Sequence, residues 1–261
     1  MAYRYDKDLE FLKELSSPEL DELVKILTHD KDGKVRFTEE LTNNDLYKKH
    51  YPDHKEYIEL ILEEFQKFGG NSILNIFRGG GVLYNEILRD VAKKFDVKFD
   101  ENESTNSIET SLLCKLIEEE LKNSQDENTL RELVNIFELG ISNINKQTVV
   151  MGLQSLIKIG GFKSYQIAVI VANQVMKVLL GRGLSLAANA TLTRALSLFS
   201  GPVGWTIMTT WTALDLASPA YRVTIPAVLQ IIILRLKHNT KKLNTRKCIN
   251  GKYLPIYHRK Y

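Results

Sequence analysis

SPAYRVTIPAVLQIIILRL, residues 218–236, decides the fold, because a signal for the start of a helix is followed here by a long apolar segment. Serine followed by proline is typical of the first turn of a helix. Residues Val223–Leu234 carry no charge and are mostly apolar, with Pro226 among them. The preceding segment begins in the same way, with SGP at residues 200–202. The sequence therefore predicts helices at Pro202–Ala217 and Pro219–Leu236, joined as a tight helical hairpin.

These apolar segments are short for a bilayer. Residues 195–214 are uncharged, but the break at residues 200–202 interrupts them. A helix over Pro202–Ala217 would be about 24 Å long, against a hydrocarbon core of about 30 Å. A helix buried inside a bundle explains the pattern as well as a membrane hairpin does. The pattern fits both, and we favour a protein that associates peripherally with a membrane.

Charge divides the chain in two. Residues 1–147 have a net charge of −11, whereas residues 148–261 have a net charge of +14 and a single acid, Asp215. The segment from residue 237 to the end has eight lysines and arginines and no acid. An acidic module joined to an apolar, basic one indicates a membrane surface or an apolar protein as partner.

Helical spacing of apolar residues runs through most of the chain. Tyr57, Ile61, Phe65 and Phe68, for example, fall on one stripe with acids opposite. We expect an all-α protein in which an acidic, multi-helix N-terminal part is packed with, or tethered to, an apolar C-terminal bundle. The predicted units are a small helical domain (1–45), an acidic helical domain (46–147), the apolar bundle (148–236) and a disordered basic tail (237–261).

Several motifs resemble the YaaW-like family of uncharacterised bacterial proteins. They are Tyr3-Arg4-Tyr5-Asp6-x-Asp8-Leu9-x-Phe11-Leu12, Arg36-x-Thr38-Glu39-Glu40-Leu41-Thr42, Phe77-Arg78-Gly79-Gly80-Gly81-Val82, Gly201-Pro202-x-Gly204-Trp205, and Pro219-Ala220-Tyr221-Arg222-Val223-Thr224-Ile225-Pro226. The resemblance covers residues 3 to about 236, and its larger part is likened to ubiquinol–cytochrome c chaperones. It implies a helical protein that resembles an assembly factor and acts at a membrane, and it brings no catalytic residues.

Two loops are the candidates for small ligands. Arg78, Gly79, Gly80 and Gly81 precede a helix and form a candidate anion nest, with a flexible connector or a close helix crossing as the alternative. Residues 28–39 overlay a calcium loop, but threonine at its first position and arginine at its ninth favour a plain polar turn.

Metal and catalytic sites find little support. His50 and His54 are close in sequence, but Pro52 between them breaks the register that would aim both at one ion. No nucleophile–base set or nucleotide fingerprint is present. We therefore expect no metal, no cofactor and no enzymatic activity.

Asp215 is the residue most in need of a partner, because an unpaired charge in an apolar bundle costs several kcal/mol. Arg222 follows across the hairpin turn, and Arg194 lies on the preceding helix. We expect Asp215 to form a buried structural ion pair with one of them. A protonation switch in a membrane-facing bundle is the alternative.

The hypothesis from sequence is a non-enzymatic protein at the cytoplasmic face of a membrane. The residues expected to contact anionic lipid or an apolar partner are Trp205, Trp211, Lys241, Lys242, Arg246 and Lys247. The alternatives are a soluble, chaperone-like interaction module whose oppositely charged halves pack together, and nucleic-acid binding through the basic tail. Two distant cysteines and a polar start predict a cytoplasmic protein. The oligomeric state is left open.

Overall fold

The computed structural model describes residues 3–69, 81–122, 127–184, 190–198 and 221–249. The helices are, in chain order, η1 (Glu10–Glu14), α1 (Ser17–Thr28), η2 (Leu41–Asn43), α2 (Asp45–His50), η3 (His54–Tyr57), α3 (Ile58–Gly69), α4 (Tyr84–Lys94), α5 (Thr105–Lys122), α6 (Glu127–Phe137), α7 (Lys146–Ile159), α8 (Gly161–Leu180), α9 (Ala190–Leu198) and α11 (Tyr221–Ile249). Within these ranges the β-structure is one isolated bridge, between His29 and Val35. The all-α prediction is confirmed.

The first long helix shows how local sequence sets an element. Ser16 and Glu19 form a capping box at the start of α1, and Pro18 stands in its first turn. Leu20, Leu23 and Leu27 then turn inward, so the amphipathic stripe of α1 faces the core.

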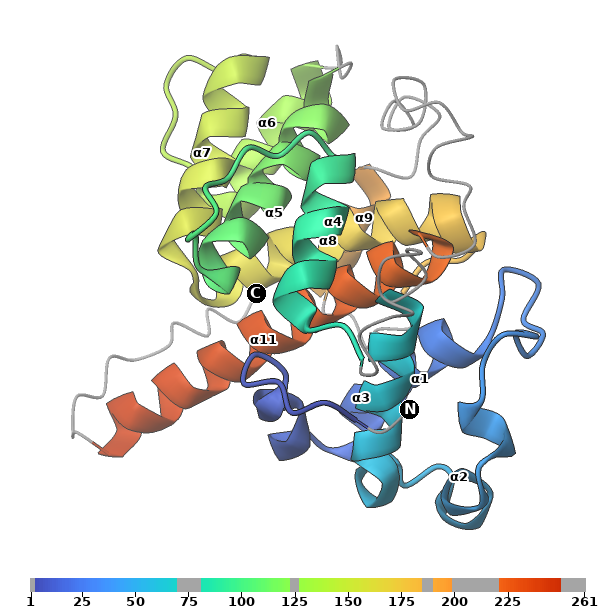
Figure 1. The fold of residues 1–261 in the computed structure, drawn as a ribbon. Helices are drawn as coiled ribbons and strands as arrows, with labels where there is room; N and C mark the ends of the chain where they lie inside the picture. The colour runs from blue at the N-terminus through green and yellow to red at the C-terminus, as the bar shows by residue number, and fades with distance from the viewer. Residues whose placement is uncertain (1–2, 70–80, 123–126, 185–189, 199–220, 250–261) are drawn as a thin grey trace.

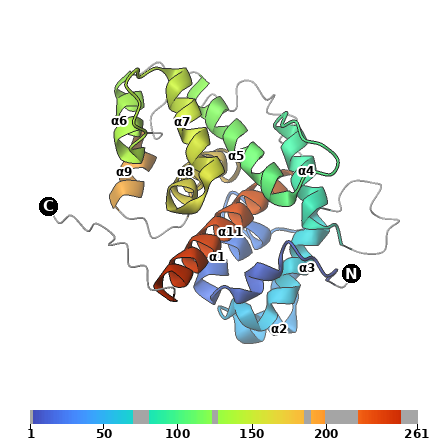
Figure 2. The ribbon, with the colours of Figure 1, turned by 90° about the vertical axis from the view of Figure 1, so that its left-hand side faces the viewer.

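Helix α11 is the centre of the molecule. It passes between the N-terminal helices α1 and α3 on one side and α5 and α8 on the other (Figures 1 and 2). Every residue from Val223 to Leu234 is buried, Pro226 included. A helix that is apolar all round needs neighbours all round. The apolar residues 223–234 are therefore buried inside the protein, and their helix packs against both the acidic and the basic half of the chain.

A sharp corner separates α7 from α8. Gly160 and Gly161 both have positive φ, +80° and +81°, which residues with a side chain rarely adopt. The two helix axes differ by 120°. No single helix in the described ranges is long and apolar enough to cross a membrane. Helices α7 and α8 reach that length and apolar composition only when they are taken together across this bend.

Helix α6 ends at Phe137, and the residues that follow leave the helical conformation, since Glu138 and Gly140 take positive φ values of 50° and 63°. Helix α9 is described over residues 190–198. The first partner of the predicted hairpin, residues 202–217, lies outside the described residues.

The basic segment after residue 236 also differs from the expectation. The sequence predicts a disordered tail there, but α11 continues to Ile249. Lys237 and Lys241 lie one helical turn apart, and both contact Glu19 of α1, at 3.0 and 2.6 Å. Lys242 contacts Glu14 at 3.1 Å. The ion pairs with these acids of the N-terminal part stabilise the helical conformation of the basic segment.

Candidate functional site

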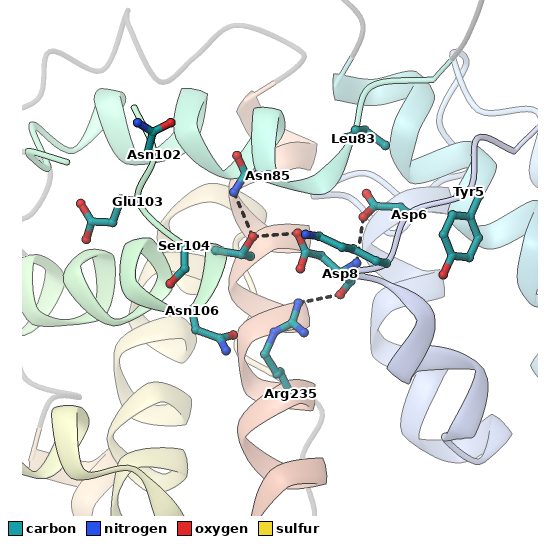
Figure 3. Close-up of a pocket in the computed structure, with 12 residues that line it drawn as sticks. Tyr5, Asp6, Asp8, Leu83, Asn85, Asn102, Glu103, Ser104, Asn106 and Arg235 are labelled. Atoms are coloured by element: carbon teal, nitrogen blue, oxygen red, sulfur yellow. Dashed lines mark hydrogen bonds between the residues drawn. The ribbon is translucent and has the colours of Figure 1, made fainter. Parts of the chain in front are cut away.

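A polar cleft of about 760 Å³ opens where the N-terminal segment meets α4, α5 and α11 (Figure 3). Carboxylates, amides, hydroxyls and two cations line it. The residues are Tyr5, Asp6, Lys7, Asp8, Leu83, Asn85, Asn102, Glu103, Ser104, Thr105, Asn106 and Arg235. Its size is within the range of small-molecule sites, so the commitments of its polar groups decide what it can do.

The floor of the cleft is a buried ion pair between halves of the chain. Arg235 of α11 donates from Nε to Glu109 Oε1 of α5 at 3.0 Å, and from Nη2 to the carbonyl of Asp8 at 2.7 Å. The Tyr84 hydroxyl donates to the same Glu109 oxygen at 2.6 Å. The guanidinium also lies over the ring of Phe11, 4.4 Å from its centroid. Arg235 thus connects residues 126 and more positions away from it.

The two aspartates of the N-terminal segment serve two helix starts. Asp6 Oδ2 accepts the backbone N–H of Tyr84, the first residue of α4, at 2.6 Å. Asp8 Oδ2 accepts the hydroxyl of Thr105, the first residue of α5, at 2.7 Å. Asn85 donates to that same hydroxyl. Carboxylates are stabilised at the positive end of a helix, so the spacing Asp6-x-Asp8 holds α4 and α5 side by side.

Burial dominates the electrostatics of this floor. It raises the pKa of Glu109, while the charge of Arg235 and the hydroxyl of Tyr84 oppose the shift. Burial likewise raises the pKa of Asp6 against the hydrogen bonds from Tyr84 and Asp8. The pKa of Arg235 is raised because Glu109 and Tyr84 outweigh the cost of its burial. These groups are engaged with one another, so the arrangement acts as a tertiary clamp.

The glycine loop is described in part. Arg78, Gly79 and Gly80 lie outside the described residues, whereas Gly81 is buried against Gln66 of α3. A Cβ atom at Gly81 would come 2.5 Å from Gln66 Oε1, which already accepts the backbone N–H of Arg4. At Gly81, close packing accounts for the glycine. The anion nest stays a prediction.

The predicted ion pair at Asp215 is untested, because Asp215, like Trp205 and Trp211, lies outside the described residues. Arg194 contacts Glu132 of α6 at 3.5 Å, and Arg222 is exposed at the start of α11. The structure does place a buried ion pair between the halves of the chain, but it joins Glu109 and Arg235.

The remaining predicted contact residues lie along the end of α11. Lys241 and Lys242 pair with Glu19 and Glu14, as described above. Arg246 and Lys247 belong to the same helix, and their side chains lie outside the described part of the chain.

The calcium-like loop is organised as a turn. Asp30 Oδ1 accepts the backbone N–H groups of Asp32 and Lys34, both at 2.9 Å, and so folds the loop on itself. Glu39, which would be the last calcium ligand, bonds instead to the hydroxyl and backbone N–H of Thr42. Within the described ranges, no three histidines, cysteines or acids gather as a metal site would require.

The two histidines around Pro52 line one pocket beside the start of α1, and His54 is the more buried of the two. His54 is buried, and its Nδ1 lies 2.5 Å from the Tyr57 hydroxyl. Its Nε2 lies 3.4 Å from Asp21. These contacts place His54 as part of the packing between η3 and α1.

One surface feature stands apart from this packing, at the corner between α7 and α8. Ile159 is 76% exposed and Phe162 is 50% exposed, and Met151, two turns earlier on the outer face of α7, is 60% exposed. Lys158 is exposed beside them. We call these four residues the α7–α8 corner. The four residues are apolar or basic, and the exposed acid Glu138 contacts Lys163, the residue after Phe162, at 2.8 Å.

Sequence reasoning missed both the clamp and the corner. Arg235 gave a signal, because it is the cation that ends the apolar run from Val223, but its partners lie far away in the chain. Ile159 and Phe162 gave none, because periodicity alone predicts that such residues turn inward.

A family model described as a domain of unknown function, DUF3944, matches residues 3–37, the segment that contains Asp6 and Asp8. The chain is similar to a UPF0174 protein of Helicobacter pylori strain J99, with 48% identity over 247 residues that cover 95% of this chain and 97% of that protein. It is similar to the UPF0174 protein YaaW of Escherichia coli K12, with 34% identity over 89% of this chain and 95% of YaaW. The resemblance to YaaW-like proteins is confirmed. No solved structure matches the chain.

Proposed function

This chain belongs to the UPF0174 family, and we propose that it is a non-enzymatic protein that associates with the cytoplasmic face of an anionic membrane. The α7–α8 corner contacts the lipid, while the acidic N-terminal half binds a protein partner, as an assembly factor would. The observation that carries the proposal is the exposure of Ile159 and Phe162 beside Lys158 and Lys163.

The corner has the composition of an interfacial anchor. Such anchors place aliphatic and aromatic side chains among the acyl chains and lysines among the lipid phosphates. Lys158 has no ion-pair partner among the described residues, and Lys163, in the first turn of α8, contacts Glu138 at 2.8 Å with part of its side chain exposed. Both lie next to Ile159 and Phe162 in the sequence.

The expected affinity is modest. Complete burial of a side chain such as Ile or Phe contributes about 1.5–3 kcal/mol, so moving the exposed parts of Ile159 and Phe162 into lipid contributes about 2–3 kcal/mol together. A lysine near an anionic leaflet adds about 1 kcal/mol. This sum supports reversible binding that depends on both lipid charge and the apolar side chains.

Co-sedimentation with vesicles tests the proposal. The full-length protein should bind vesicles of phosphatidylglycerol and phosphatidylcholine, bind less at 0.5 M salt, and bind weakly to phosphatidylcholine alone. The double variant Ile159→Ser/Phe162→Ser should lower the partition coefficient about 30-fold or more. Phe37→Ser is the matched control, because Phe37 is fully exposed on the loop after α1. Equal loss in both variants, or no binding of the unmodified protein to anionic vesicles, would refute the proposal.

A second candidate function has its own support. Lys237, Lys241 and Lys242 of the basic end pair with Glu14 and Glu19 of the acidic half. Charges that are already paired favour an interaction module whose halves pack on each other and which acts away from membranes. Failure to bind any vesicle, together with capture of a protein partner that depends on the exposed acids of the N-terminal half, would favour it. Nucleic-acid binding through the basic segment 237–261 would appear as retention of single-stranded DNA that a truncation after residue 236 abolishes.

A further inference from the structure

A second, smaller pocket lies between α1, the loop after it, α2 and the end of α8. Its volume is about 340 Å³, and its lining combines two tyrosines with three basic side chains. Tyr47 and Tyr51 come from α2 and its C-terminal cap, Lys25 and His29 from the end of α1, and Arg182 from the turn after α8. Asp21 is the acid in the lining, and Lys25 contacts it at 2.7 Å.

The aromatic wall is well defined. The rings of Tyr47 and Tyr51 lie 5.2 Å apart between centroids and are tilted by 32°. Tyr51 is half exposed, whereas Tyr47 is partly buried against Tyr57. An exposed ring supported from behind by another offers a flat apolar surface on which a planar ligand can stack.

Arg182 provides the charged end. Gly181 ends α8 in the left-handed conformation, with φ of +67°, and so turns Arg182 toward α1. There Arg182 Nη1 bonds to Glu22 Oε1 at 2.6 Å. A guanidinium has five N–H donors, so this single bond leaves donors for a phosphate or carboxylate.

A buried guanidinium nitrogen adds an independent observation. Arg36 Nη2 is buried and has no hydrogen-bond partner among the described residues. Burial lowers the pKa of Arg36, the charge of Asp30 opposes this shift, and the positive charges of Arg182 and Arg222 add to it. Arg36 is not part of the pocket lining, so it adds to the positive potential around Arg182 without touching a ligand there.

The negative end of α1 does not cancel this attraction. Its last carbonyls already accept protein donors: the His29 N–H bonds to Lys25 O, the Thr28 hydroxyl to Val24 O, and Arg36 Nε to Ile26 O. The helix end facing the pocket is therefore largely capped.

We propose that this pocket binds a small aromatic phosphate of mononucleotide size, with its ring on Tyr47 and Tyr51 and its phosphate on Arg182 and His29. A volume of about 340 Å³ suits one ring system with one anionic group. The pocket is separate from the α7–α8 corner, so the test of ligand binding does not depend on whether the protein binds vesicles.

Isothermal titration calorimetry on the full-length protein tests the site, with adenosine monophosphate, adenosine and inorganic phosphate as probes. Adenosine monophosphate should bind with a Kd below about 1 mM, and each partial probe should bind at least about tenfold more weakly, the effect of losing about 1.4 kcal/mol. Tyr51→Ala should weaken the binding of adenosine monophosphate and adenosine. Arg182→Gln should weaken the binding of adenosine monophosphate at least about tenfold. Arg131→Gln, which removes an exposed arginine of α6, is the matched control.

Arg182→Gln also breaks the contact with Glu22, so a second variant separates binding from folding. Glu22→Gln removes the same ion pair but keeps the guanidinium, and it should bind adenosine monophosphate as well as, or more tightly than, the unmodified protein. Equal losses in Glu22→Gln and Arg182→Gln would overturn the proposal. Equal affinity for phosphate and adenosine monophosphate would also overturn it. The absence of a heat of binding with adenosine monophosphate at about 5 mM would do the same.

Discussion

Replacing Arg235 by methionine is the sharpest test of the clamp between the halves. Methionine keeps most of the apolar stem, but it leaves Glu109 with the Tyr84 hydroxyl at 2.6 Å as its remaining donor. The carbonyl of Asp8 also loses its donor. The Glu109 side chain is 6% exposed and that of Arg235 is 13% exposed, so water replaces little of what is lost. Removing one partner of such a pair costs about 3–5 kcal/mol, a large part of the stability of an ordinary domain.

Urea unfolding followed by circular dichroism at 222 nm measures this cost. Arg235→Met should lower the free energy of unfolding by about 3–5 kcal/mol at pH 7. The double variant Glu109→Gln/Arg235→Met should be less destabilised than Arg235→Met, because it leaves no buried charge without a partner. A loss of less than about 1 kcal/mol in Arg235→Met, or a double variant at least as unstable as the single one, would refute the reasoning.

The pH dependence of that cost has a definite sign. The pKa of Glu109 is raised by burial, and Arg235 opposes the shift, so the pKa rises further when Arg235 is removed. Above the pKa of an unfolded glutamate, about 4.3, the folded variant holds the proton more tightly than the unfolded chain, and stability falls as pH rises. The deficit of Arg235→Met should therefore be smaller at pH 5 than at pH 8. A deficit that is constant between these pH values would contradict the assignment to Glu109.

Three further predictions concern stability and use thermal or urea unfolding. Glu120 is buried, its carboxyl oxygens have no hydrogen-bond partner among the described residues, and burial raises its pKa to about 8. Glu120→Gln should therefore stabilise the protein, and the gain in stability should grow from about pH 4.3 to about pH 8 and then level off. An unchanged Tm of the variant at pH 8 would contradict this prediction. Partial burial alone would raise the pKa of Glu19, but hydrogen bonds from Lys241, Lys237 and Ser16 hold it at about 2. Glu19→Ala should cost about 1–2 kcal/mol at pH 7, from the lost ion pairs with Lys237 and Lys241 and the lost hydrogen bonds from Ser16, and the part of this deficit that depends on charge should disappear as pH falls from about 4.3 toward 2. Gly81→Ala should cost about 1–3 kcal/mol, since the new Cβ meets Gln66 and Gln66 holds Arg4; a stabilised variant would show that this contact yields freely.

The sequence by itself determined the all-α class. Apolar residues at helical spacing, the capping box of Ser16 and Glu19, and the proline in the first turn of α1 act over a few residues, so they can be recognised without the fold. It also determined that residues 223–234 must be covered, since a helix that is apolar all round requires neighbours all round. The length of α11 was not predictable in this way, because the acids that pair with Lys237, Lys241 and Lys242 lie more than 200 positions away.

Only the tertiary structure decided which charges meet. Arg235 reaches Glu109 and the carbonyl of Asp8 because α11 passes between helices from both halves, and nothing within several residues of Arg235 specifies those partners. The same holds for Ile159 and Phe162, whose spacing resembles that of core residues although the bend at Gly160 and Gly161 leaves them exposed. Local sequence sets backbone conformation through interactions within a turn or two of helix, whereas burial and charge pairing depend on contacts that exist only after the chain has folded.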